Sequence, residues 1–447
     1  MTLRGTLIFL LLVLPALALL AFGPRQAPHV PPDRTVVRYW EKWTGVEGAV
    51  MKRIVAEYNQ TQGAEDGIWV EYLAVSNVDQ RTLVAVAGGD PPDLAGLYDH
   101  IIAQFADRDA LLPLDDLVQE SGIDADAFKP AWWNIGVYND RLYALPSTPY
   151  VIALYYNKRL FREAGLDPDR PPRTLAELDE YSRKLTRFEA GRIVQAGFIP
   201  APKLLGWWHW VWLYFFGGNL WDGQQFTLDT PAGRAAHRWM YEQRVEMGLK
   251  QSVAFEANVG AVEGPLNPFL AERLAMVYQG PWVANWVRQY KPSLEYGVAR
   301  FPADREDRHP VFVSSDVFVI PRGSRHPREA MRFLRYLLRQ DVLERLCREH
   351  WKLSPFRTPS EDFFENHPIR EHIRTLDALA DSDDVFGYPR MPTWSEASVE
   401  MLFMIENIFQ GHRPPDEALR ETQAKIDAIV NEYQRMAALR RAAEATP

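Results

Sequence analysis

The chain has 447 residues, more than a single hydrophobic core usually serves, so we expect two or more lobes. Hydrophobic residues make up 47% of it and charged residues 24%, which is typical of a soluble globular protein. The net charge of -9 argues against a nucleic-acid-binding face, and the single cysteine, Cys347, excludes disulfides and a cysteine-based zinc site.

The N-terminus, residues 1–23, reads as an export signal or a signal anchor. Arg4 provides a positive start, and residues 7–22 form an apolar run that Pro15 interrupts. The run is short for a membrane span, so a cleaved secretory signal is favoured, and an uncleaved anchor stays open as the alternative. Residues 24–33 are rich in proline and form a linker. We therefore expect a periplasmic or otherwise extracytoplasmic protein.

The next part of the chain alternates between strand and helix patterns. β-branched and aromatic runs predict strands, and apolar residues at helical spacing predict helices. The predicted strands are 35–40, 67–75 and 92–98, and the predicted helices are 47–62, 79–89 and 101–118. This alternation predicts an α/β lobe with a mostly parallel sheet.

The later elements are less regular. Helix 173–188 begins with a capping box, in which Thr174 is followed three residues later by Glu177. Further amphipathic helices are predicted at 230–248, 326–350 and 417–442, and buried strands at 151–157 and 311–321. Cys347 falls on the apolar stripe of its helix, as an inert buried thiol does.

Sequence signatures of catalysis are missing. The chain has no P-loop, GxGxxG, GxSxG or HExxH motif, and its ten histidines do not cluster with carboxylates at ligand spacing. Two carboxylates form a glycosidase pair only at a fixed separation in space, which sequence does not give. We predict neither catalytic residues nor a metal or organic cofactor.

Several segments, taken in order, resemble a known family. The most specific is the tyrosine-rich strand with the helix start after it, "RLYALPSTPYVIALYYNKRLFREAGL". The others are "VVRYWEKWTGVEG", "VAGGDPPDLAGLYD", "ERLAMVYQGPW" and "SSDVFVIPRGS". Together they are similar to the extracellular solute-binding proteins of carbohydrate ABC importers (family 1, maltose-binding-protein-like). The lipid-anchor cysteine of many members is absent, which leaves the mode of retention open.

The resemblance implies a two-lobe α/β fold of the periplasmic-binding-protein-like type II class, with a hinge and an interlobe ligand cleft. The first lobe is expected at 34–147 plus 282–320, and the second at 148–281 plus 321–447. Crossings between lobes are expected near 146–150, 280–282 and 320–321. The implied partners are a carbohydrate ligand and the membrane permease of an ABC importer. We expect a monomer that binds no nucleic acid.

A sugar site needs carboxylates and amides for the hydroxyls and aromatic rings for the apolar face of the sugar. In the tryptophan-rich stretch 206–221, helical spacing places Trp208 and Trp212 on a core face and Trp207 and Trp210 on another. The candidate ligand-binding residues are Glu41, Trp43, Thr44, Asp99, Trp207, Trp208, Trp282, Ser315, Asp316, Trp351, Arg357 and Trp394.

Three functions compete at this point. The leading one is a carrier that captures a carbohydrate, most simply a di- or oligosaccharide, and delivers it to an ABC importer. A membrane-tethered sugar-sensing subunit is the second, and it requires the N-terminal segment to stay uncleaved. An extracellular carbohydrate-active hydrolase or lyase is the third, and it requires two carboxylates in a fixed geometry.

Overall fold

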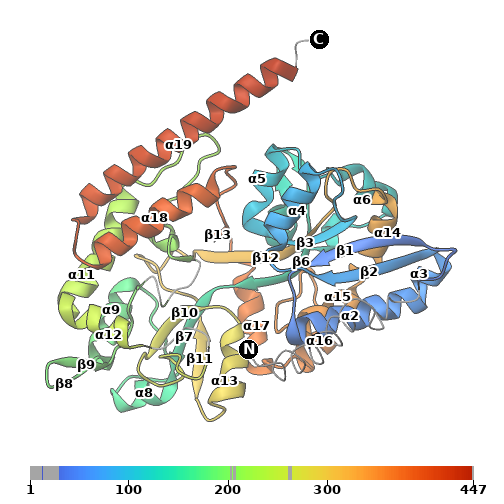
Figure 1. Ribbon diagram of the computed structural model, residues 1–447. Helices are drawn as coiled ribbons and strands as arrows, with labels where there is room; N and C mark the ends of the chain where they lie inside the picture. The colour runs from blue at the N-terminus through green and yellow to red at the C-terminus, as the bar shows by residue number, and fades with distance from the viewer. Residues whose placement is uncertain (1–12, 14–29, 202–203, 205–207, 260–263, 445–447) are drawn as a thin grey trace, which may run out of the picture.

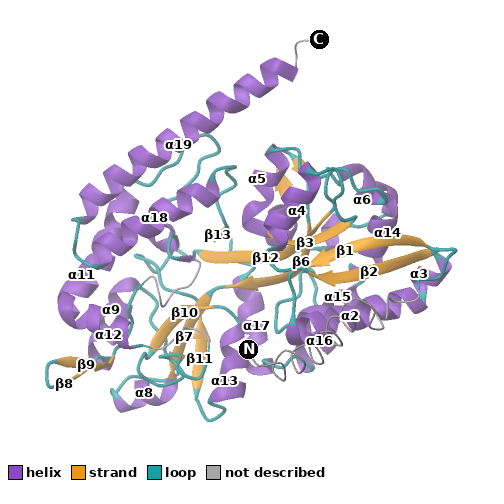
Figure 2. Cartoon of the chain, viewed as in Figure 1, coloured by secondary structure: helices purple, strands orange, loops and turns teal. Residues whose placement is uncertain are grey.

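A computed structural model describes residues 13, 30–201, 204, 208–259 and 264–444. Two sheets divide these residues into two lobes (Figures 1 and 2). The six-stranded sheet of the first lobe has the order β13-β12-β3-β1-β2, and β6 also pairs with β12. Its strands are β1 (Thr35–Glu41), β2 (Ile68–Ala74), β3 (Leu94–Tyr98), β6 (Leu145–Val151), β12 (Val311–Val319) and β13 (Val385–Phe386).

Strands β1, β2 and β3 are parallel, as the alternating pattern predicts, and β12 runs antiparallel to β3. A small hairpin of β4 (Val137–Tyr138) and β5 (Arg141–Leu142) lies at the edge of this lobe. The lobe's helices are α2 (Gly45–Gln60), α3 (Gln62–Glu65), α4 (Val78–Ala87), α5 (Ile102–Asp107), α6 (Asp115–Ser121), α7 (Pro130–Trp133), α14 (Pro327–Leu337) and α15 (Gln340–Glu349), with 3-10 turns η1 (Asp99–Ile101), η2 (Ala125–Ala127) and η3 (Asn134–Gly136).

The second lobe is built on an antiparallel three-stranded sheet of order β10-β7-β11, with a separate hairpin, β8–β9. These strands are β7 (Ala153–Asn157), β8 (Arg187–Glu189), β9 (Arg192–Gln195), β10 (Met276–Gln279) and β11 (Tyr296–Ala299). The helices are α8 (Lys158–Glu163), α9 (Leu175–Leu185), η5 (Val211–Phe216), α11 (Pro231–Met247), α12 (Leu249–Asn258), α13 (Trp282–Tyr290), α18 (Trp394–Phe409) and α19 (Pro415–Glu444). Two further helices, α16 (Glu361–Glu365) and α17 (Arg370–Leu379), belong to neither lobe alone.

Helices α16 and α17 lie between the two lobes, since α17 contacts β11 and also pairs with Lys129 of the first lobe. Helix α19 begins against α11 and α18, and its C-terminal end projects beyond the two lobes (Figure 1). Near that far half the Tyr433 hydroxyl donates to the Asp107 carboxylate of α5. The C-terminal helix therefore touches both lobes.

The lobe boundaries differ from the prediction. Residues 282–299 were expected in the first lobe, but β11 pairs with β7 in the second sheet. Residues 327–349 were expected in the second lobe, but α14 packs on β1 and α15 packs on α2 and β6 of the first. Helices α14 and α15 belong to the first lobe because each carries a continuous apolar face, and burying that face requires packing against the first sheet.

Two of the predicted crossings move accordingly. The chain passes from the first sheet to the second at Ile152, just beyond the predicted 146–150. It returns between β11 and β12, through residues 300–310, instead of at 280–282. No change of sheet occurs at 320–321, since the next helix stays with the first lobe; the last passage lies between α17 and α18.

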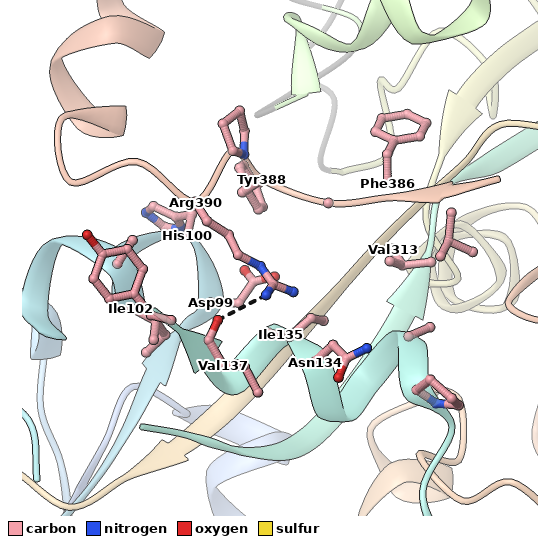
Figure 3. A pocket seen from close by; sticks show the side chains of 17 residues that line it. Asp99, His100, Ile102, Asn134, Ile135, Val137, Val313, Phe386, Tyr388 and Arg390 are labelled. Carbon is pink, nitrogen blue, oxygen red and sulfur yellow. Dashed lines mark hydrogen bonds between the residues drawn. The ribbon is translucent and has the colours of Figure 1, made fainter. Parts of the chain in front are cut away.

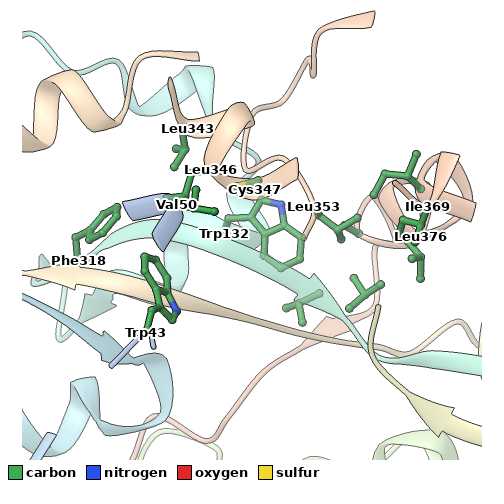
Figure 4. Packing of buried hydrophobic residues seen from close by; sticks show 14 of the residues in the cluster. Trp43, Val50, Trp132, Phe318, Leu343, Leu346, Cys347, Leu353, Ile369 and Leu376 are labelled. Carbon is green, nitrogen blue, oxygen red and sulfur yellow. The ribbon is translucent and has the colours of Figure 1, made fainter. Parts of the chain in front are cut away.

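The first lobe packs its helices on the sheet through a large apolar cluster (Figure 4). Trp43, Trp132 and Phe318 lie in it with residues of α15, and Cys347 is fully buried among them. The burial predicted for Cys347 is therefore confirmed. Among the described residues, none of the helices combines the length and the apolar character that crossing a membrane requires.

Within the tryptophan-rich stretch, Val211–Phe216 form a 3-10 helix, η5, instead of the expected α-helix. Trp208, Trp210, Trp212 and Tyr214 are all buried, so the core position expected for Trp208 and Trp212 is confirmed, and Trp210 and Tyr214, expected on another face, are buried as well. These side chains are buried because they pack against other aromatic rings. Trp210 contacts Phe312, Tyr388 and Trp394. Trp212 contacts Phe198 and Trp239. Trp207 lies outside the described residues.

Candidate functional site

Strand β12 carries polar side chains through the middle of the molecule. Asp316 is buried in it, and its carboxylate accepts a hydrogen bond from the Thr148 hydroxyl at 2.8 Å. Lys42 lies 3.2 Å from the same carboxylate. Burial alone would raise the pKa of Asp316, but Lys42 and Lys352 hold it below its ordinary value. A charged residue in mid-strand is therefore satisfied by a cation from the loop after β1.

Lys42 is the centre of a buried ionic cluster. Its ammonium donates to Glu41 and to the Leu97 carbonyl, both at 3.2 Å, and lies 4.8 Å from the centre of the Tyr98 ring. Burial lowers the pKa of Lys42, but the two carboxylates outweigh burial and raise it. Glu41 is fully buried and also accepts from the Tyr39 hydroxyl at 2.6 Å.

Glycine is required beside this cluster. A Cβ added to Gly96 on β3 would lie 1.7 Å from a Glu41 carboxylate oxygen. Glu41 thus fills the space that a side chain on β3 would occupy, and it faces protein on all sides. We assign Glu41 to holding Lys42, in place of the predicted contact with a ligand.

Asp99 stands at the end of β3, where the first turn of η1 begins. Burial raises its pKa from 3.8 to about 7, and hydrogen bonds from Ser314 and from backbone amides partly oppose that rise. The Ser315 amide lies 3.4 Å from the carboxylate. Asp99 therefore changes charge near neutral pH.

A cavity of about 260 Å³ opens beside Asp99 (Figure 3). The first lobe contributes His100 and Asn134, and the segment after β13 contributes Tyr388 and Arg390. The His100 and Tyr388 rings lie 5.3 Å apart, and burial lowers the pKa of His100 to about 4, which makes it neutral. Arg390 donates to the Val137 carbonyl at 3.0 Å, so its guanidinium reaches across the cavity.

An aromatic cluster of Tyr150, Trp208 and Trp282 lies where the chain crosses between the lobes. The Tyr150 and Trp282 rings are 5.3 Å apart, and Trp208 lies 5.4 Å from Trp282. The Lys352 ammonium lies 4.5 Å from the Tyr150 ring and 4.9 Å from Trp282, within cation–π range. The Ser314 and Tyr150 hydroxyls are hydrogen-bonded to each other at 2.9 Å, which links this cluster to the neighbourhood of Asp99.

Of the predicted residues, Asp99 lines the cavity. Ser315 and Asp316 lie near it on β12, where the Ser315 amide donates to Asp99. Trp208 and Trp282 contact each other in the aromatic cluster and are not among the residues that line the cavity.

The other predicted residues are placed differently. Trp43 is buried 4.6 Å from the His350 ring, and Thr44 is exposed at the start of α2. The Arg288 guanidinium covers Trp351 at 4.1 Å. Arg357 is exposed and donates to the Asp126 carbonyl at 3.0 Å, on the first lobe. Trp394 is buried 5.0 Å from Trp210 and supports the cavity wall from behind.

Sequence reasoning missed the cations and two tyrosines of the site: Lys42, Tyr150, Lys352, Tyr388 and Arg390. Lys42 stands between two predicted residues, and Tyr150 ends a predicted crossing, so position in the chain was a usable signal for these two. Nothing local identifies Lys352, which lies beside Tyr150 where the Leu353 amide donates to the Pro149 carbonyl.

Within the part of the chain that the structure describes, no group of three histidine, cysteine, aspartate or glutamate side chains is arranged to hold a metal ion. The chemistry on offer is hydrogen bonding and aromatic contact.

Comparison with known proteins places this arrangement in a family. The family model for bacterial extracellular solute-binding proteins matches residues 42–343. The sn-glycerol-3-phosphate-binding periplasmic protein of Shigella flexneri is 28% identical over 309 residues, which cover 65% of each chain.

Solved structures agree with it. CpMnBP1 bound to mannotriose is 27% identical, has a TM-score of 0.74, and is matched over 88% of this chain and 99% of its own. The sugar-binding protein MalE of Xanthomonas citri shares the fold. It is 20% identical, has a TM-score of 0.74, and is matched over 90% of this chain and 99% of its own. The predicted two-lobe fold is thereby confirmed. The chain belongs to the bacterial extracellular solute-binding proteins and acts outside the cytoplasm.

Proposed function

We propose that this protein captures a carbohydrate between its lobes and delivers it, unchanged, to an ABC importer. The observation that carries the proposal is the cavity itself, where the Asp99 carboxylate and the Arg390 guanidinium lie beside the Tyr388 ring. Carboxylates and guanidinium groups bind hydroxyls, and an aromatic ring supplies the apolar surface that a sugar face needs. The sugar-bound relative CpMnBP1 supports the same substrate class.

The residues that line the cavity come from two separate parts of the chain, and this arrangement explains how a sugar would be captured. Asp99 and Asn134 belong to the first lobe, whereas Tyr388 and Arg390 follow β13 and lead into α18 of the second. A bound sugar bridges the two sets and favours the closed arrangement, because it contacts both only when the lobes are together. A permease that separates the lobes then releases the sugar.

Asp99 accepts hydroxyl hydrogen bonds best when it is ionised. Its pKa near 7 means that binding draws the carboxylate into the charged form and releases a proton. The affinity for a neutral sugar therefore rises between pH 6 and 8. Residues 1–23 act as the export signal in this proposal, and the importer's permease is the protein partner.

Thermal unfolding of the exported chain against mono-, di- and oligosaccharides and polyols tests the proposal. A ligand at a hundred times its dissociation constant stabilises the folded state by about 2.7 kcal/mol. Asp99→Asn should weaken binding about 10- to 100-fold. This is the loss expected when a hydrogen bond to a charged group, which contributes roughly 1.5–3 kcal/mol, is removed. Asp116→Asn, an exposed aspartate of the first lobe, is the matched control and should change nothing. A panel without any shift would refute carbohydrate capture.

A further inference from the structure

The cavity beside Asp99 continues into a larger groove. The segment 385–390 and residues 137–138 line both, so the two spaces meet at Arg390. The groove has a volume of about 760 Å³, whereas the cavity has about 260 Å³. Small-molecule sites usually occupy roughly 300–1,000 Å³, so the cavity is small for a whole ligand and the groove is not.

The groove carries the chemistry of sugar recognition on both walls. On the second lobe, Asn219, Trp221 and Asp222 line it, and Trp221 is only half-buried. On the first lobe, Asn139 and Asp140 form the turn of the β4–β5 hairpin and are exposed. Carboxylate and amide groups thus face the same groove as an accessible indole.

Both walls are held rigidly, as a binding surface requires. Asn139 and Asp140 have φ values of 46° and 60°, the left-handed pair of a two-residue type I′ hairpin. On the other wall the Asn219 amide donates to the Trp221 carbonyl at 2.8 Å, and the Asp222 carboxylate accepts from the amides of Gln224 and Gln225 at 2.8 and 2.7 Å. These hydrogen bonds from the backbone amides of Gln225 and Gln224 also hold the pKa of the Asp222 carboxyl below its ordinary value, so the side chain stays ionised.

Glycine makes the second wall possible. Gly217 has a φ of 75°, and a Cβ there would lie 2.4 Å from the Arg308 guanidinium. Because other residues adopt this left-handed φ only with strain, glycine favours the turn out of η5 toward Trp221.

We propose that the groove is a second subsite, in which Trp221 stacks on a further sugar ring and Asp140 and Asp222 accept its hydroxyls. The inference rests on the proposed function and narrows it: the cargo is an oligosaccharide of three or more rings. One end lies in the cavity at Asp99, and the chain passes Arg390 and leaves along the groove.

Calorimetric titration with manno- and malto-oligosaccharides of two to five rings tests the subsite. In the series that binds, affinity should rise from two rings to four. Trp221→Ala should weaken the four-ring sugar about five- to tenfold, as expected for losing one aromatic contact, and weaken the disaccharide less. Asp140→Asn keeps the left-handed turn, which asparagine tolerates, and should act in the same direction. Trp69→Ala, in β2 of the first lobe, is the control.

The outcomes separate the two proposals. Affinity that does not depend on ring number, or an equal loss for all lengths in Trp221→Ala, would overturn the second subsite and leave carbohydrate capture standing. A loss confined to the longer sugars supports the subsite. If no sugar of either series binds, the second subsite is overturned, whereas carbohydrate capture is refuted only if the wider thermal panel also shows no shift.

Discussion

Asp99 makes the stability of the ligand-free protein depend on pH in a direction that can be calculated. Its pKa is about 7 in the folded chain and 3.8 ordinarily. Between these values the folded state holds a proton that the unfolded state has lost, so stability falls as pH rises. Each unit of pKa difference corresponds to about 1.4 kcal/mol, which gives at most about 4 kcal/mol above pH 7. Water in the partly open cavity reduces this, and we expect about 2 to 4 kcal/mol.

Asp99→Asn removes the titrating group but keeps the size and an acceptor for the Ser315 amide. Urea unfolding of both proteins from pH 4 to pH 8 measures the difference in free energy of unfolding. That difference should change by about 2 to 4 kcal/mol in favour of the variant as pH rises. Asp116→Asn should show no such trend. A constant difference between Asp99→Asn and the native chain over this range would refute the argument.

Two further substitutions test the buried cluster. Lys42→Gln leaves Glu41 and Asp316 buried without their shared cation, so the free energy of unfolding at pH 7 should drop by about 3–5 kcal/mol. A loss below 1 kcal/mol, the size of an exposed ion pair, would contradict this. Gly96→Ala should cost about 1–3 kcal/mol in urea unfolding because its methyl group meets the Glu41 carboxylate. Gly88→Ala, whose nearest neighbour would be 3.3 Å away, should cost less; equal losses would refute the steric account.

The regular part of the fold could be predicted from local pattern. The strands predicted at 35–40 and 311–321 appear as β1 and β12. Their β-branched and apolar residues favour a strand that is buried in a sheet, so the local sequence was a sufficient signal. Helix 326–350 is instead two helices, α14 and α15, separated at Leu338 and Arg339. Which lobe receives a segment depends on contacts far apart in the sequence, and this is why 282–299 and 327–349 were assigned to the wrong lobes.

The site was predicted less completely. Asp99 and Trp282 follow a strand end and a Gly-Pro bend, so their positions carry a local signal. Glu41 also stands at a strand end, yet its side chain points into the core, in the space left by the missing side chain of Gly96 on β3. Lys352 and Arg390 reach the cleft from late loops, and no periodicity or spacing indicates where a loop returns.

If this chain binds an intact carbohydrate between its lobes, isothermal titration of the exported protein must detect it. The titrant is the sugar that gives the largest thermal shift, and mass analysis of the recovered sugar follows. We predict one binding site per chain, weakened by Asp99→Asn and unaffected by Asp116→Asn, and sugar of unchanged mass. Binding that ignores Asp99→Asn would move the site elsewhere, and cleaved sugar would contradict the carrier outright.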